Sequence, residues 1–204
     1  MTKSFVIGVV TFFAAISNSM ASITTYETRN IDQSINVSDY KGSWFGQTSA
    51  ITVRDLADFN GSVLPGGVQG GFSALTVSFN TVTSGTNWGF RFAPDAGLGG
   101  EIYLDNQLLN RNSSDLWWGG NWSNSTEVLS ATGLSLGAGN HVFTAYWAEN
   151  CCNGAQGLQY TMDGTNWSSM SSLASPAAVP LPSVAWLFVS GFLGVLGLGR
   201  KQQA

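Results

Sequence analysis

The segment His141-Val-Phe-Thr-Ala-Tyr-Trp-Ala148 decides the fold class of this chain. Its apolar residues do not recur at a helical period, and successive side chains of an extended strand point to opposite faces. One face would carry Phe143, Ala145 and Trp147, and the other Val142, Thr144 and Tyr146. Because both faces hold large side chains, we predict an inner strand that is covered on both sides.

Three segments upstream show the same alternation. Their inward-facing residues would be Leu75, Val77 and Phe79 in residues 74–81, Trp88, Phe90 and Phe92 in residues 88–93, and Ile102 and Leu104 in residues 101–105. Turn residues separate the segments, at positions 65–67, 84–87, 97–100, 137–140 and 163–164. Short strands with frequent turns predict an all-β fold, an antiparallel β-sandwich or jelly roll. Residues 53–59 are expected to form a short helical turn.

Two stretches carry a resemblance to a known fold, Tyr103-Leu-Asp-Asn106 and Leu136-Gly-Ala-Gly-Asn-His141, within residues 90–110, 134–150 and 157–164. The pattern resembles the PA14 type of β-sandwich and its fungal-adhesin relatives. In sugar-binding members, two consecutive aspartates hold calcium. The matching position here reads Pro94-Asp95-Ala96, so one carboxylate is missing and Asp95 would need help from loop carbonyls, Asn121 or Asn150. We therefore predict no metal and no cofactor, with Asp95 capping a turn.

Both ends of the chain carry targeting sequences. Lys3, an apolar run and Ser19-Met-Ala21 have the pattern of a signal peptide over residues 1–21, which leaves residues 22–175 as one extracellular β-sandwich domain. Val179, Pro180, Leu181 and Pro182 precede an apolar segment, residues 183–199, and then Arg200 and Lys201. Residues 176–204 resemble the PEP-CTERM sorting domain in its Val-Pro-Leu-Pro variant. The resemblance implies recognition by an exosortase and a single, transient transmembrane helix, with an ordinary membrane anchor as the alternative.

The only two cysteines are adjacent, Cys151 and Cys152. They should be oxidised in an exported chain. We predict a vicinal disulfide between them, although it would strain the backbone because adjacent Cα atoms lie only about 3.8 Å apart. Intermolecular bridges, a metal site shared with His141, and a reduced pair are the alternatives. The Cys-Cys-x-Gly sequence resembles a group of PEP-CTERM proteins that carry this motif.

The segment Leu116-Trp-Trp-Gly-Gly-Asn-Trp-Ser-Asn124 contains three indoles among glycines and polar residues, which is unlike a core strand. Exposed indoles beside asparagines suit stacking on sugar rings. The candidate ligand-binding residues are Trp117, Trp118, Asn121 and Trp122. The alternative is that one or two of these indoles fold under the loop as core.

Composition and residue types disfavour an enzyme. His141 is the only histidine, and it lies inside a strand pattern, so a Ser-His-Asp arrangement would have to be built around it. Paired carboxylates for a glycosidase remain the alternative, and the available acids are Asp95, Glu101, Asp105, Asp115 and Glu149. We predict no catalytic residues.

Charge excludes one class of partner. Removing both targeting segments leaves 5 of the 8 basic residues and all 12 acidic ones, a net charge near −7. Such a domain repels phosphate backbones, so nucleic acid is not expected as a partner. The sequence predicts an exported, exosortase-sorted protein of a bacterial cell surface or extracellular matrix, anchored in the membrane before processing, with a structural or adhesive role and polysaccharide as the expected ligand.

Overall fold

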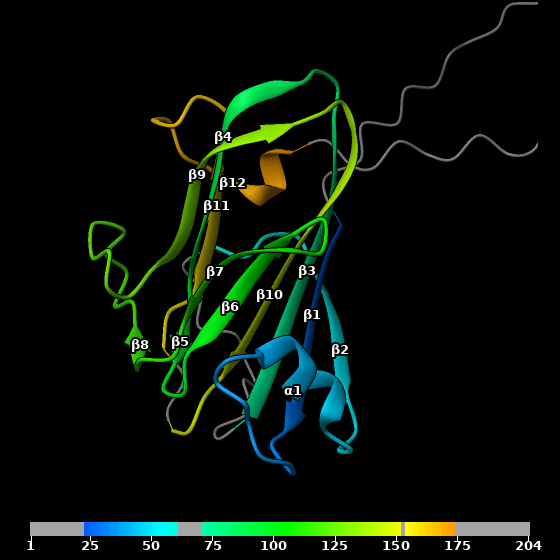
Figure 1. Ribbon diagram of the computed structural model, residues 1–204, viewed down its shortest axis with the longest axis vertical. Helices are drawn as coiled ribbons and strands as arrows, with labels where there is room; N and C mark the ends of the chain where they lie inside the picture. Colours follow the sequence, from blue (N-terminus) through cyan, green and yellow to red (C-terminus); the bar gives the residue numbers. More distant parts are fainter. Residues whose placement is uncertain (1–22, 61–70, 152–153, 174–204) are drawn as a thin grey trace, which may run out of the picture.

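The computed structural model describes residues 23–60, 71–151 and 154–173. They form two antiparallel sheets (Figure 1). The larger sheet has the order β2-β1-β3-β10-β6-β7 and the smaller has the order β12-β11-β4-β9. In the larger sheet the bounds are β1 Ile23–Asn30, β2 Thr52–Leu56, β3 Gly71–Thr81, β6 Gly100–Leu104, β7 Gln107–Asn112 and β10 Gly139–Ala148. The smaller sheet contains β4 Gly85–Ala93, β9 Leu129–Leu136, β11 Gly157–Thr161 and β12 Ser168–Ser169.

Short elements complete the fold. Two two-residue strands, β5 Asp95–Ala96 and β8 Leu116–Trp117, pair with each other beside the sheets. One helix, α1 Tyr40–Gly46, and a 3₁₀ turn, η1 Met170–Ser172, are the helical elements of the described residues. None of these helices is long and apolar enough to cross a membrane.

The main core lies between the two sheets and confirms the predicted β-sandwich. All eight residues that the sequence placed inward on the three upstream segments belong to it, together with Phe143, Ala145 and Trp147 of β10. Aromatic rings join the sheets directly: Phe90 stacks on Phe143 with centroids 5.4 Å apart, and Phe92 lies 5.0 Å from Trp147. Such pairs add directional contacts to the burial of apolar area.

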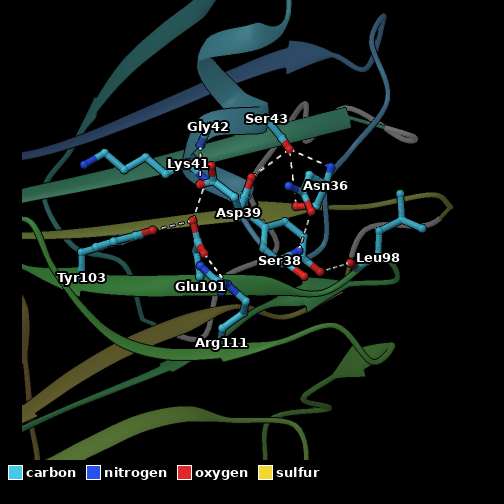
Figure 2. A network of polar contacts seen from close by, with 11 residues as sticks. Asn36, Ser38, Asp39, Lys41, Gly42, Ser43, Leu98, Glu101, Tyr103 and Arg111 are labelled. Carbon is cyan, nitrogen blue, oxygen red and sulfur yellow. Dashed lines mark hydrogen bonds and ion pairs between the residues drawn. The ribbon is translucent and has the colours of Figure 1, made fainter.

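The outer face of β10 is covered only toward its end: Tyr146 is buried, as predicted, whereas Val142 on the same face is 40% exposed. Tyr146 and Tyr103 pack there with Tyr40 and Trp44 of α1, in a second apolar cluster. The helix begins after Asp39, whose carboxylate accepts a hydrogen bond from the Gly42 backbone N–H at 2.8 Å. Figure 2 shows the polar contacts that hold this end of the helix against the sheet.

The prediction of a helical turn at residues 53–59 is wrong. Residues 52–56 form the edge strand β2, which pairs with β1 in a register that joins Thr24 to Leu56 and Thr28 to Thr52. Pairing with β1 provides hydrogen-bond partners for the backbone N–H and C=O groups along one edge of residues 52–56. This tertiary contact overrides the local preference for a helical turn.

The two ends of the described chain lie at one end of the sandwich. Ile23 pairs with Ser78 near the end of β3, and Leu173 shares a small cavity with Thr81, the last residue of β3. The opposite end is formed by Gly71, where β3 starts, and by Ala148, where β10 finishes (Figure 1). The predicted signal peptide, the Val179–Pro182 motif, the 183–199 helix and Arg200–Lys201 fall outside the described residues and stay predictions.

Candidate functional site

A cavity of about 350 Å³ opens at the end of the sandwich where β10 finishes. Three separate segments form its wall: residues at β5, residues at β8, and the chain that follows β10. The lining residues are Asp95, Gly97, Asp115, Trp117, Glu149, Asn150, Cys151 and Gly154. This cavity, here called the β10-end pocket, lies at the opposite end from Ile23 and Leu173.

Glu149 holds two of these segments together. One carboxylate oxygen accepts the Gly97 backbone N–H at 2.8 Å, and the other accepts the N–H groups of Asn150 and Cys151, both at 2.7 Å. The side chain is buried, with 8% of the residue exposed. Both oxygens of Glu149 are therefore committed to backbone amides and shape the pocket wall.

Asp95 is the second buried carboxylate of the pocket. It lies in strand β5 rather than in a turn, and its Oδ2 accepts the N–H of Gly154 across 59 residues of sequence. Burial raises the pKa of Asp95, and the negative charges of Glu149 and Asp115 raise it further against the lowering effect of the Gly154 bond. Asp95 also lines the pocket, and no other hydrogen bond to its carboxylate is made within the described residues.

These residues do not fit a calcium ion. Beside Asp95, Ala96 is completely buried in the main core and carries no carboxylate. Glu149 already binds three backbone amides, and no group of three acidic, histidine or cysteine side chains within the described ranges is arranged to hold a metal. A hard cation that needs six to eight oxygens has too few here.

The three indoles of the 116–124 segment have different environments. Trp117 lines the pocket and is 67% exposed, and its backbone N–H is fixed by Glu127 at 2.6 Å. Trp118 is 3% exposed and lies 4.4 Å from the half-buried Trp122. The chain turns between them at Gly119 and Gly120, both at positive φ.

Of the predicted ligand-binding residues, the structure places Trp117 at the pocket. Trp118, Asn121 and Trp122 lie outside its lining. Trp118 is buried and presents no ring face to solvent. This agrees with the alternative that one or two of these indoles fold under the loop as core. Asn121 is exposed, with its side-chain oxygen accepting the Ser123 N–H at 3.0 Å. The carboxylates Asp115 and Glu149, considered above only as candidate acids, are the pocket residues that the ligand prediction omitted.

Cys151 and His141 line different cavities of the structure. Cys151 lies at the pocket and donates its N–H to Glu149, while Cys152 falls outside the described residues, so the vicinal disulfide stays a prediction. His141 lines a different cavity, with Nδ1 2.7 Å from Asp105 Oδ2 and Nε2 3.0 Å from the Gly137 carbonyl. Because both ring nitrogens are occupied, a serine has no free nitrogen to use as its base.

Comparison with known proteins supports the fold. No protein-family model and no curated protein sequence matches the chain. Among solved structures, the PA14 domain of the antifreeze protein MpAFP is similar with a TM-score of 0.51 and 13% identity, covering 85% of this chain and 100% of that domain. A PA14 sugar-binding domain from an RTX adhesin is similar with a TM-score of 0.51 and 14% identity, covering 78% and 100%. The described chain has a PA14-like sandwich, as its turn motifs predicted.

Proposed function

We propose that this domain binds carbohydrate in the β10-end pocket, as the ligand-binding head of an exported adhesive or matrix protein. The observation that carries the proposal is the exposed indole of Trp117 on the wall of a pocket whose other walls are carboxylates and amides. An indole face packs against the C–H face of a sugar ring, and Asp95, Asp115 and Asn150 supply partners for its hydroxyl groups. The similar PA14 domain of the RTX adhesin is a sugar-binding domain, which is consistent with this assignment.

The position of the pocket suits an adhesive role. It lies at the end of the sandwich away from Ile23 and Leu173, so a chain held at either terminus would present the pocket outward. This agrees with the proposal that residues 1–21 are a signal peptide and that 176–204 are a sorting region recognised by an exosortase. Intact-mass spectrometry of the protein recovered from cells tests the second proposal. A mass that ends near Pro182 supports processing, whereas a retained 183–199 segment makes it an ordinary anchor.

A binding experiment with a matched control tests the pocket. Trp117→Ala removes the exposed ring of the pocket, while Phe45→Ala removes an equally exposed ring, 68% exposed, on α1. We expect Trp117→Ala to weaken retention on the polysaccharide of the producing cells by about tenfold or more, as loss of a buried aromatic contact does. Phe45→Ala should bind like the unaltered protein. Equal binding by the unaltered protein and by both variants would show that the pocket is not the binding site.

A glycosidase is the second candidate, because the raised pKa of Asp95 in a pocket with two more carboxylates resembles a general-acid site. The bonds of Glu149 count against it, since a base or nucleophile needs a free oxygen and both are committed. Turnover of a glycan panel that disappears in Asp95→Asn would establish the enzyme. If the domain binds glycans but turns over none of them, the binding module is the function that stands.

A further inference from the structure

Arg91 lies on the outward face of the smaller sheet. Its neighbours in β4, Phe90 and Phe92, are completely buried in the core, so the alternation of the strand directs Arg91 to the opposite side. Across the sheet it pairs with Gln159 of β11 on one side and with Ser130 of β9 on the other. None of these residues lines the β10-end pocket.

Two indoles enclose the guanidinium group of Arg91. Its central carbon lies 4.5 Å from the ring centre of Trp122 and 4.3 Å from that of Trp167. The rings come from different loops, one before β9 and one before β12. Gln159 Oε1 accepts from Nε at 2.9 Å and also from Nη2. These four residues, Arg91, Trp122, Gln159 and Trp167, are called the Arg91 sandwich below.

The sandwich holds a positive charge that no carboxylate neutralises within the described residues. The ion pairs found among the described residues join Arg111 to Glu101 and His141 to Asp105, and neither includes Arg91. A guanidinium has five N–H donors, of which Gln159 occupies two, so the pair of donors on Nη1 and the second donor of Nη2 have no partner there. Partial burial of the group lowers the pKa of Arg91.

The open edge of this guanidinium matches a planar or tetrahedral oxyanion. Nη1 and Nη2 present parallel N–H groups, which bind two oxygens of one carboxylate or sulfate at once. The flanking rings hold the guanidinium plane fixed, so little side-chain entropy remains to be lost on binding. Gln159 takes the inner edge and thereby directs the free edge away from itself.

We propose that the Arg91 sandwich is a second binding site, specific for the carboxylate or sulfate groups of an acidic polysaccharide. The net charge of the chain, −4, disfavours nucleic acid as a partner, so the attraction for an acidic group at this site rests on the local guanidinium charge. Asn121 and Asn166, which precede Trp122 and Trp167 in sequence, are exposed, and the Asn166 amide donates to Asp163. This site is separate from the β10-end pocket and does not depend on it.

The test measures binding of the full chain to three soluble polysaccharides by titration calorimetry: polygalacturonate, dextran sulfate and uncharged dextran. Arg91→Met keeps the alkyl stem and removes the charge, while Arg91→Lys keeps the charge and removes the fork. Arg54→Met removes one exposed positive charge from the edge strand β2 and serves as the control. We expect Arg91→Met to lower the affinity for an acidic polysaccharide by about tenfold or more, and Arg91→Lys to recover only a small part of it. Arg54→Met should remain within about twofold because exposed charges contribute little.

The outcomes are separable. Binding of polygalacturonate alone identifies a carboxylate ligand, and binding of dextran sulfate alone identifies a sulfate ligand. Equal losses in Arg91→Met and Arg54→Met would reduce the effect to overall charge and overturn the proposal, as would failure of the unaltered protein to bind either acidic polymer. Trp117→Ala should leave this affinity unchanged, which distinguishes the site from the pocket. Should Arg91→Met fail to fold, tryptophan fluorescence of the unaltered protein decides: polygalacturonate or dextran sulfate must change the emission, and dextran must not.

Discussion

Arg111 Nε lies 2.6 Å from Oε2 of Glu101, and the Glu101 side chain is completely buried. The other carboxylate oxygen accepts the Lys41 backbone N–H at 2.5 Å and the Tyr103 hydroxyl at 2.8 Å (Figure 2). One carboxylate thus joins β6, β7 and the first turn of α1. Since every partner donates a hydrogen bond, the buried charge is fully compensated.

Removing the cation of this network should destabilise the domain strongly. Arg111→Met leaves the Glu101 charge buried beside two neutral donors, and breaking a buried pair in this way costs about 3 kcal/mol. Urea denaturation of the variant against the unaltered protein measures the change. Arg54→Met, which removes an exposed charge, should cost less than about 1 kcal/mol. Similar costs for the two variants would mean that the network contributes little to folding.

Position 157 leaves no room for a side chain, because two indoles pack against β11 there. A Cβ atom at this position would lie 2.9 Å from Cζ2 of Trp122 and 3.2 Å from Cη2 of Trp118. Rigid rings cannot move aside easily, so Gly157→Ala should cost about 1–2 kcal/mol and displace the 118–122 loop. The melting temperature and the tryptophan emission report the two effects. At Gly137 a Cβ would meet nothing within 4 Å, and Gly137→Ala should change neither property. An unaltered emission in Gly157→Ala would show that the loop accommodates the methyl group.

The strands β3, β4, β6 and β10 could be predicted because their side chains alternate, whereas α1 could not. Its sequence, Tyr-Lys-Gly-Ser-Trp-Phe-Gly, contains two glycines and three aromatic residues and has a poor intrinsic helix propensity. The helix forms because Tyr40 and Trp44 are buried against β10 and because Glu101, 60 residues away, accepts the Lys41 N–H. Contacts of this range leave no local pattern in a single sequence.

The candidate site was predictable only in part, for a similar reason. The polar, indole-rich segment indicated a surface loop, but which ring faces solvent depends on the direction of the chain at Gly119 and Gly120. Asp95 and Glu149 meet because β4 and β10 both finish at the same end of the sandwich. The two residues are 54 positions apart in sequence, so a single sequence does not show that they are close, although Glu149 directly follows one predicted strand and Asp95 lies two residues after another.

The pairing of His141 makes stability depend on pH from about 6.5 upward. Burial opposes the charged ring, but the hydrogen bonds to Asp105 and to the Gly137 carbonyl outweigh it and raise the pKa of His141 above its ordinary value. A raised histidine pKa stabilises the fold fully below the unfolded value, about 6.5, and the benefit is lost as pH rises through the folded value. Melting temperatures should therefore fall across this interval. In His141→Gln the fall should be absent, and its persistence would assign it to another group.

Substitution of Asp95 should have the opposite effect to substitution of His141, because it should raise the stability of the domain at neutral pH. Because burial and then the charges of Glu149 and Asp115 raise this carboxyl pKa, the contribution of Asp95 to stability is greatest at acid pH and decreases as pH rises through the folded value. Asp95→Asn keeps an oxygen acceptor for the Gly154 N–H and removes the charge. Its melting temperature should exceed that of the unaltered protein at pH 7, and the difference should vanish toward acid pH. Asp55→Asn, on the exposed strand β2, is the control and should show little change. A lower melting temperature for Asp95→Asn at pH 7 would mean that the ionised carboxylate is the better partner for Gly154.

Calcium should be dispensable for the fold and for binding at the β10-end pocket. The reason is positional: Ala96 occupies a core site and has no side-chain oxygen, its carbonyl accepts the Gly99 N–H, and the oxygens of Glu149 are held by the amides of Gly97, Asn150 and Cys151. A ligand that binds the folded state alone must raise the melting temperature by mass action. We therefore expect identical melting curves with calcium and with a chelator, and unchanged retention on polysaccharide in both buffers. A melting temperature that rises with calcium concentration, and a retention that a chelator abolishes in step with it, would show that Asp95 and nearby carbonyls complete a cation site after all.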